Sequence, residues 1–488
     1  MSCPRGWLVA LLAAVCLAAT AVPASAGAQR DEQPSPLRWR ECARSSDAQC
    51  ARLTVPLDDT NPDDHRTIHL NLARVQARDP ERRVGSLLVN PGGPGVPGSG
   101  FAPEIAGALP EEIQDRFDIV GWDPRGTGQS GIGCNDELDS LYALDWDPDT
   151  AVERHALEAA NRAYVDSCVR AAGDLLPFVS SDRTARDMDR IRAALGEDQL
   201  TYLGFSYGTY LGAQYAAQFP QRVRALVLDG AVDPALDATA AQVGQAVGFE
   251  HSLDLFFEHC AATRSCAFHG GDAPAAAYDR LRARVDDDPI DTADGRGLNG
   301  TLFDIGVAQL LYEGEDSWST LADALAAAED GDGSDLIAYA DLYTGRDDDG
   351  RYDDVQGSFI AIGCADGPPM GDVAAVRAIE ARAATVAPRL GRSIVNNSLA
   401  CAFWPVQAPP PAPLAAPESA PILVLGTRND PATPLAWARG LAQELGSATL
   451  VTVGGARHTA FASGNGCVDR VVERYLVGLD VPRNGKRC

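Results

Sequence analysis

The chain has 488 residues, 45% of them hydrophobic, so it is long enough for a large domain that carries a substantial insertion or a second subdomain. Its formal net charge of −27 at pH 7 repels the phosphate backbone of nucleic acid and anionic membrane surfaces, so neither is expected as a partner. This charge is typical of a solvated acidic surface that keeps an exported protein soluble, although an acidic mouth that attracts a cationic substrate would also contribute to it.

The first 26 residues have the pattern of a secretory signal peptide. Arg5 precedes an apolar run at 7–22, and an A-x-A cleavage site at 24–26 follows the run. We therefore expect cleavage after Ala26 and a secreted, extracellular protein. A lipid-modified Cys16 is the alternative, but Val15 stands where such sites have a small residue. No later run has the roughly 18 apolar residues of a spanning helix, so the mature chain should be free of the membrane.

The cysteines indicate disulfide bonds. Twelve occur, and two of them lie in the signal peptide, which leaves an even number in an exported chain. No C-x-x-C couple or Cys/His cluster has zinc spacing, so we expect no metal site, and nothing indicates a cofactor. Connectivity does not follow from sequence, but proximity along the chain suggests the pairs Cys42 with Cys50, Cys134 with Cys168, Cys260 with Cys266, Cys364 with Cys401, and Cys467 with Cys488.

Strand-like and helix-like segments alternate over residues 27–233. Apolar and polar residues alternate at 52–57 and 67–77, which is typical of an antiparallel pair. This alternation of segments predicts an α/β fold with a mostly parallel central sheet and helices on both faces. Apolar runs typical of buried strands occur at 85–90, 117–122, 200–204 and 224–229, and helical periodicity occurs at 209–219 and at 181–195, the latter with Ser181 as its expected cap.

The pattern changes after residue 233. Residues 234–407 are rich in Ala, Leu and acidic residues, with helix-like runs at 242–257 and 318–329, which predicts a large, mainly helical cap insertion. A Pro-rich connector at 408–420 follows and should be stiff and extended. The strand pattern resumes at 421–426 and 449–453, with a helix at 441–445, so residues 421–488 should complete the core.

The segment 204–208 indicates a serine nucleophile. Gly204 and Gly208 stand two positions either side of Ser206, between a strand-like run and a helical one. In such a G-x-S-x-G elbow the glycines permit a sharp turn that lifts the hydroxyl clear of the sheet. A five-residue pattern also arises by chance, so the assignment depends on finding the partners that a serine hydroxyl needs.

Those partners are a histidine base and a carboxylate that orients it, and hydrolases with this elbow place them in the order serine, acid, histidine. Of the seven histidines, only His458 follows both the elbow and the insertion, which makes it the predicted base. Asp430, shortly after the strand at 421–426, is the predicted acid. Asp229, at the end of the strand at 224–229, is the alternative, because some hydrolases of this order vary the acid's position.

A developing oxyanion needs two backbone donors. One is predicted to be the amide of Tyr207, which follows the serine. The other should come from the glycine turn after the strand at 85–90, and the amide of Gly93 is favoured over its neighbours, because glycine lets the backbone approach the substrate closely. An ordinary tight turn is the alternative reading of these glycines.

With these pieces in place, the sequence resembles the secreted tripeptidyl aminopeptidases of actinobacteria, relatives of the proline iminopeptidases within the α/β-hydrolases. Asn90 and Arg457 depart from the pattern, since iminopeptidases have histidine at the first position and family members usually have glycine at the second. The motifs that carry the resemblance are Asn-Pro-Gly-Gly-Pro-Gly at 90–95, Asp-Pro-Arg-Gly-Thr-Gly-Gln-Ser at 123–130, Gly-Phe-Ser-Tyr-Gly-Thr at 204–209, Cys-Ala-Phe-Trp-Pro at 401–405, Asp-Pro-Ala-Thr-Pro at 430–434 and Gly-Lys-Arg-Cys at 485–488.

The resemblance implies an α/β-hydrolase fold and a monomeric serine exopeptidase that releases short peptides, expected to be tripeptides, from the free amino terminus of peptide substrates. In the relatives, acidic residues of the cap bind the substrate's ammonium group. A carboxylester hydrolase with the same triad is the alternative function, and a non-catalytic binding protein is opposed by the intact set of catalytic residues. The candidates for the ammonium site here are Glu250, Glu258, Glu313 and Glu315.

Overall fold

The computed structural model describes residues 37–43, 45–135, 138–269, 273–292, 294–406 and 414–488. The expected signal peptide at 1–26 and the first part of the Pro-rich connector, residues 408–413, lie outside the described residues. Within the described ranges, no helix is long and apolar enough to cross a membrane.

Ten strands of the described chain form one sheet, in the order β1-β2-β3-β5-β4-β6-β7-β10-β11-β12. Strands β1, β2, β3 and β5 pair antiparallel with one another in that order, and every pair from β5 to β12 is parallel. The strands are β1 (Arg40–Cys42), β2 (Ser45–Pro56), β3 (Thr67–Val75), β4 (Gly85–Asn90), β5 (Phe117–Trp122), β6 (Leu200–Phe205), β7 (Val223–Asp229), β10 (Ile422–Thr427), β11 (Ala448–Val453) and β12 (Lys486–Arg487).

Helices cover both faces of this sheet, as the sequence predicts. Every residue of β4, β5, β6 and β10 is buried, because side chains on both faces of these strands pack against helices. One face packs against α5 (Ser181–Leu195), α6 (Tyr207–Gln218) and α15 (Leu435–Leu445), and the other against α1 (Gly98–Ala106), α2 (Glu111–Arg116) and α16 (Gly466–Gly478).

The predicted core elements are confirmed, and most of their ends lie within a few residues of the predicted ones. Strands β4 and β5 and helix α5 have the predicted bounds, whereas β2 begins seven residues earlier than predicted, at Ser45. The expectation that Ser181 caps α5 is wrong. The cap residue is Ser180, and Ser181 is the first helical residue, whose backbone amide donates to the carboxylate of Asp366 at 2.7 and 2.9 Å.

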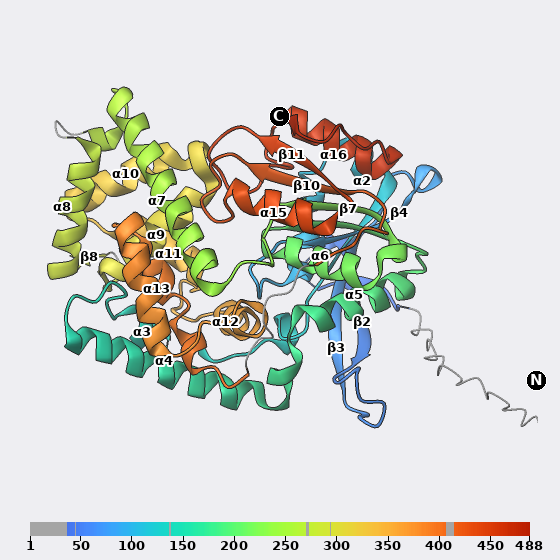
Figure 1. Ribbon diagram of the computed structural model, residues 1–488, viewed down its shortest axis with the longest axis horizontal. Helices are drawn as coiled ribbons and strands as arrows, with labels where there is room; N and C mark the ends of the chain where they lie inside the picture. Colours follow the sequence, from blue (N-terminus) through green and yellow to red (C-terminus); the bar gives the residue numbers. More distant parts are fainter. Residues whose placement is uncertain (1–36, 44, 136–137, 270–272, 293, 407–413) are drawn as a thin grey trace, which may run out of the picture.

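A helical cap lies beside the sheet, at the left of Figure 1. Within the described residues of 234–407 it comprises α7 (Ala238–Ala262), α8 (Pro274–Asp287), α9 (Gly300–Glu313), α10 (Trp318–Glu329), α11 (Ser334–Thr344), α12 (Val355–Asp366), α13 (Val373–Val386) and α14 (Gly391–Asn396), with a small hairpin of β8 (Ile290–Asp291) and β9 (Gly297–Leu298). This segment runs from the end of the sheet strand β7 to the connector before β10, where the sequence places the insertion.

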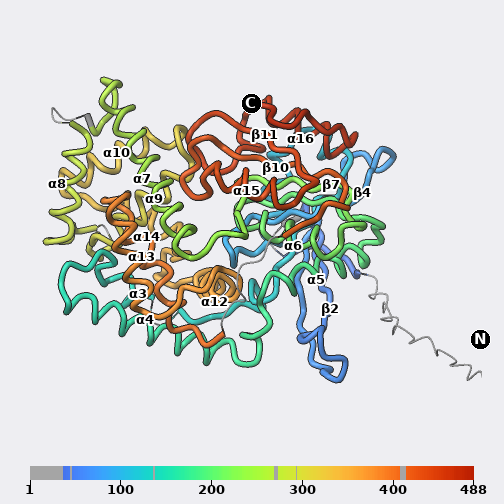
Figure 2. Tube along the Cα trace, in the orientation of Figure 1, coloured from blue at the N-terminus to red at the C-terminus, as the bar shows by residue number. Residues whose placement is uncertain are grey.

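The cap also takes in an earlier stretch of chain. Helices α3 (Leu138–Tyr142) and α4 (Ala151–Ala172) run along its lower edge in Figure 2, and Leu157 and Tyr164 are buried in the same hydrophobic cluster as the later cap helices. Arg154 of α4 forms an ion pair with Glu380 of α13 at 2.7 Å. The sequence analysis assigns residues 138–172 to the core, but their buried apolar side chains pack with those of the later cap helices, so we group them with the cap.

Five disulfides form between described cysteines, and they are the five pairs expected from proximity along the chain. Three of them involve cap helices. Cys134, just before α3, is bonded to Cys168 of α4, Cys260 of α7 is bonded to Cys266 just beyond that helix, and Cys364 and Cys401 fix α12 to the short helix η8 (Leu399–Phe403).

Candidate active site

Ser206 lies on a strained turn between β6 and α6. Its backbone angles are φ 52° and ψ −124°, a conformation that side-chain-bearing residues rarely adopt. The turn needs its glycines: a Cβ on Gly204 would lie 2.4 Å from the carbonyl oxygen of Gly208, and one on Gly208 would lie 2.7 Å from Oδ1 of Asn90. The backbone amide of Ser206 donates to the carbonyl of Asp229 at 2.8 Å. The geometry is that of a nucleophile elbow.

His458 and Asp430 meet at the carboxyl ends of neighbouring strands. Nδ1 of His458 lies 2.9 Å from Oδ1 and 3.1 Å from Oδ2 of Asp430, which is 2% exposed. The amides of Ala432 and Thr433 donate to Oδ1 of Asp430, and the Thr433 hydroxyl donates to Oδ2, so the carboxylate is fixed in place. Nε2 of His458 is buried and has no hydrogen-bond partner among the described residues, so it is available to a substrate or nucleophile.

Asp229, the alternative acid, has a different role in the structure. Its Oδ2 accepts hydrogen bonds from the amides of Ala460 and Phe461 at 2.8 and 2.7 Å. These amides follow His458 by two and three residues, so Asp229 holds the segment after the histidine. The imidazole itself is bonded to Asp430.

The environment of His458 predicts the pH dependence of activity. Burial lowers the pKa of this imidazole, but its attraction to Asp430, and more weakly to Asp229 and Glu313, outweighs burial and raises the pKa above 6.5. A general base must be neutral, so kcat/KM should fall as the pH drops through this raised pKa, with a midpoint above pH 6.5. The pH profile of kcat/KM measures this midpoint, and an acid limb centred below pH 6.5 would contradict the assignment.

The glycine turn after β4 lies directly against the elbow. A Cβ on Gly92 would approach Cβ of Ser206 to 2.9 Å, and both Gly92 and Gly93 have φ above 100°. The Gly92 amide is already committed, because it donates to Oδ1 of Asn90 at 3.0 Å, so Gly93 supplies the next amide along the turn. Tyr207 is the first residue of α6, where an amide has no acceptor within its own helix.

A cavity of about 840 Å³ opens beside Ser206 and His458, and core and cap line it together. The ring of Tyr312, from α9 of the cap, lies edge-on to the imidazole of His458 with ring centres 5.4 Å apart, and its carbonyl accepts a hydrogen bond from the His458 amide at 2.9 Å. The cap therefore supplies part of the cavity wall beside the serine and also holds the histidine loop. The other residues that line the cavity include Gly93, Phe101 and Phe205 from the core, and Gln309, Tyr343 and Phe359 from the cap.

Two family models and several known proteins are similar in sequence to this chain. Residues 85–284 match the family model described as the alpha/beta hydrolase fold, and residues 387–488 match the one described as TAP-like protein. The serine protease Hip1 of Mycobacterium tuberculosis is 38% identical over 93% of this chain and 91% of its own length. The chain belongs to the TAP-like α/β-hydrolase family. Carboxylesterase B of M. tuberculosis is 37% identical over 90% of this chain and 86% of its own length, and the tripeptidyl aminopeptidase of Streptomyces lividans is 31% identical over 90% and 84%.

The cap carboxylates of this TAP-like hydrolase differ from the predicted set. Of the four candidates, only Glu313 lines the cavity beside Ser206. Glu250 is 5% exposed, forms an ion pair with Arg389 at 3.1 Å and is not among the described residues that line this cavity. Glu258 and Glu315 are exposed and are not among the described residues that line the cavity.

Two other carboxylates line the same cavity, Glu104 from α1 and Asp353 from the loop before α12. Sequence reasoning missed both. Glu104 lies in the core, outside the predicted cap, and Asp353 lies in the acidic segment 347–354, where no local pattern distinguishes it from its neighbours. Only the folded chain brings them to the serine.

Arg457, directly before His458, contacts the cap. Its guanidinium lies 2.8 Å from a carboxylate oxygen of Asp316 and 3.9 Å from one of Glu313. Glu313 is the last residue of α9, and Asp316 follows that helix. Arg457 therefore adds a charged contact between the histidine loop and the cap.

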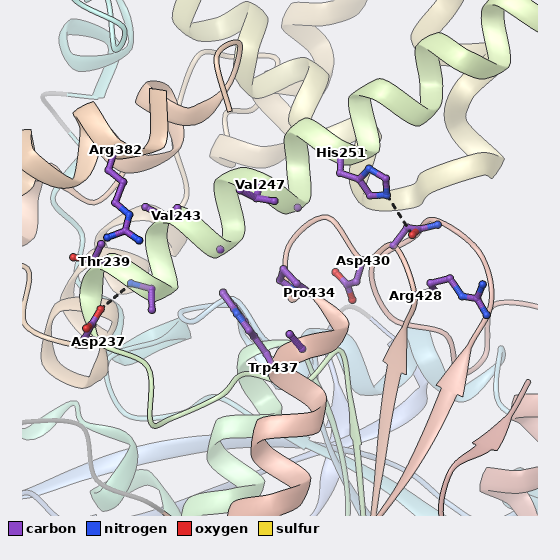
Figure 3. A pocket seen from close by; sticks show the side chains of 15 residues that line it. Asp237, Thr239, Val243, Val247, His251, Arg382, Arg428, Asp430, Pro434 and Trp437 are labelled. Atoms are coloured by element: carbon purple, nitrogen blue, oxygen red, sulfur yellow. Dashed lines mark hydrogen bonds between the residues drawn. The ribbon is translucent and has the colours of Figure 1, made fainter. Parts of the chain in front are cut away.

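A second cavity, of about 630 Å³, lies between α7 and α15, beside the loop that carries Asp430, which we call the acid loop (Figure 3). Val243 and Val247 of α7 face Pro434 and Trp437, and Asp430 reaches its edge, but neither Ser206 nor His458 is among its lining residues. Helix α7 approaches the acid loop so closely that a Cβ on Gly248 would lie 2.4 Å from the carbonyl oxygen of Pro431. The cap thus supports the acid loop as well.

Proposed function

We propose that the protein is a serine exopeptidase that releases short peptides, expected to be tripeptides, from the free amino terminus of peptide substrates through an acyl-enzyme on Ser206. The relatives named serine protease and tripeptidyl aminopeptidase support a peptidase. The observation that carries the exopeptidase proposal is the cavity beside Ser206, which cap and core line together and whose lining includes carboxylates, because cap side chains beside the serine restrict the access of folded protein and a free amino terminus is cationic.

The proposed reaction uses Ser206, His458 and Asp430 as a triad. The Ser206 hydroxyl attacks the scissile carbonyl while Nε2 of His458 takes its proton, and the amides of Gly93 and Tyr207 stabilise the oxyanion. His458 then protonates the leaving amine, which departs as the shortened substrate. Water, deprotonated by the same imidazole, hydrolyses the ester on Ser206 and releases the amino-terminal peptide. Asp430 remains ionised and holds the imidazole with its proton on Nδ1.

The proposed ammonium partners are Glu313 and Asp353, the two cap carboxylates at the cavity. Asp353 has no cationic partner among the described residues, and partial burial raises the pKa of its carboxyl. A cation placed beside it would restore the stability of its charged form. Glu313 is already near Arg457, at 3.9 Å, so it is shared between a protein cation and any substrate cation.

Acetylating the amino terminus of a tripeptidyl amide should therefore lower kcat/KM by about 10²-fold or more, on the order of 3 kcal/mol, because a carboxylate at the site would lose its ionic partner. The measurement is kcat/KM for the free and acetylated forms of one substrate. Asp353→Asn should shrink this ratio by acting on the free form alone. Asp323→Asn, which removes an exposed carboxylate of α10, is the matched control and should leave the ratio unchanged.

Equal kcat/KM values for the two forms would reject the exopeptidase and leave an endopeptidase or an esterase. A carboxylester hydrolase is the second candidate, and the relative named carboxylesterase B favours it. Simple esters assayed beside the two amides decide between them. An esterase would turn over the esters well and both amides poorly.

We further propose that the protein is secreted. Its disulfides link all ten cysteines of the described chain, and such bonds persist in oxidising compartments outside the cytosol. The sequence pattern at 1–26 supports export.

A further inference from the structure

Asp366, at the end of cap helix α12, is bonded to the core. Its Oδ1 and Oδ2 accept hydrogen bonds from the Ser181 amide at 2.7 and 2.9 Å, and Oδ2 also accepts one from the Tyr207 hydroxyl at 2.5 Å. The hydroxyls of Ser181 and Tyr207 are bonded to each other. Burial raises the pKa of Asp366 to about 6, so at pH 8 its carboxyl is ionised and can only accept hydrogen bonds. Nothing in the sequence predicts these contacts, because Asp366 lies 159 residues from Tyr207.

These bonds join two core helices at their N-termini. Ser181 is the first residue of α5, and Tyr207 is the first residue of α6, next to Ser206. A carboxylate at the N-terminus of α5 is favoured by the free amides and the helix dipole there. Asp366 therefore has a fixed position, and it holds the phenol of the residue whose backbone amide is the proposed oxyanion donor.

The same helix touches the other half of the proposed oxyanion hole. A Cβ on Gly95 would lie 2.6 Å from the backbone nitrogen of Phe359 in α12, so the glycine turn packs directly on this helix. A Cβ on Gly363 of the same helix would lie 4.0 Å from Cγ of Pro94. Figure 1 shows α12 between the other cap helices and α6, and the Cys364–Cys401 disulfide fixes it to the cap.

We propose that Asp366 is a positioning residue for the oxyanion hole, which acts through the Tyr207 hydroxyl to hold the Tyr207 amide in line with the Gly93 amide. The proposal rests on the proposed function, since it assumes acyl transfer at Ser206. An oxyanion donor stabilises charge that is present only in the transition state, and small displacements of such a donor cost rate without costing ground-state binding. Loss of the hydrogen bond between Asp366 and the Tyr207 hydroxyl should therefore lower kcat and leave KM nearly unchanged.

The test is a double-mutant cycle of Asp366→Ala and Tyr207→Phe on the full-length mature protein. Each variant is assayed at pH 8 with a tripeptidyl amide, and rates are normalised to the concentration of active sites. Each single variant should lose about 10- to 100-fold in kcat, with KM within about threefold of wild type. The double variant should lose little more than either single variant, because both remove the same interaction.

Glu380→Ala is the matched control, because Glu380 is another buried cap carboxylate, 3% exposed, but its partner is Arg154 of the cap. It should lower the melting temperature without lowering kcat per active site. The positioning role of Asp366 would be rejected if the single variants kept kcat within threefold of wild type. It would also be rejected if the two losses in kcat multiplied in the double variant. If Asp366→Ala folds poorly, Tyr207→Phe decides, because it keeps the bonds between Asp366 and Ser181.

Ser206→Ala, assayed beside these variants, separates the two proposals. If Ser206→Ala kept full activity, the assignment of Ser206 as nucleophile and the proposed function would both be rejected. If Ser206→Ala were inactive and Tyr207→Phe kept wild-type kcat, only the positioning role of Asp366 would be rejected.

Discussion

Replacing Ser206 by alanine should lower kcat by about 10⁴-fold or more and leave the fold intact. The alanine keeps the Cβ, so the strained turn at φ 52° is unchanged, while the atom that would form the acyl-enzyme is lost. Steady-state kinetics on a tripeptidyl amide measures the loss, and circular dichroism with thermal melting checks the fold.

Ser252→Ala is the matched control for this substitution. Ser252 is a fully buried serine on α7 of the cap, and its hydroxyl has no hydrogen-bond partner among the described residues. Its replacement should leave kcat within a few-fold of wild type. If Ser206→Ala itself retained activity within tenfold of wild type, the nucleophile would have to be a different residue.

Asp430→Asn should cost about 10⁴-fold in kcat, whereas Asp229→Asn should cost less than about tenfold. An amide at position 430 can present its NH₂ to Nδ1 of His458, which then carries its proton on Nε2 and cannot act as the base. At position 229 a single oxygen, Oδ2, accepts both backbone amides, and an asparagine oxygen can replace it. The two variants are compared by kcat under identical conditions, and a reversed order would transfer the role of acid to Asp229.

Much of the core could be predicted, and the residues proposed as the triad could be selected, because their signals are local or follow chain order. The apolar runs at β4 and β5 mark buried strands by composition alone. Ser206 is defined by a five-residue turn motif, and Asp430 and His458 by their place after later strands in a fixed order. Pairing each cysteine with its neighbour also gave all five disulfides, because short loops close most readily.

The parts that could not be predicted depend on contacts between distant segments. Glu250 and Glu313 are both acidic residues on cap helices, and only tertiary packing sets Arg389 beside the first and the Ser206 cavity beside the second. Helix α4 carries no local mark of the layer it joins, since its ion pair with Glu380 spans 226 residues. Asp366 was missed for the same reason.

The cap consists of two separate stretches of chain, and this limits which segments can be exchanged when chimeras are made between members of this family. Residues 138–172 lie before the elbow and α7 to α14 lie after it, yet both bury side chains in one cluster. A chimera that exchanges only the later stretch would place foreign helices against native α3 and α4 and would leave mismatched apolar surfaces within a close-packed interior. A functional transplant has to exchange both stretches at four junctions, and for the same reason the later stretch cloned alone would expose the apolar surface that α4 covers.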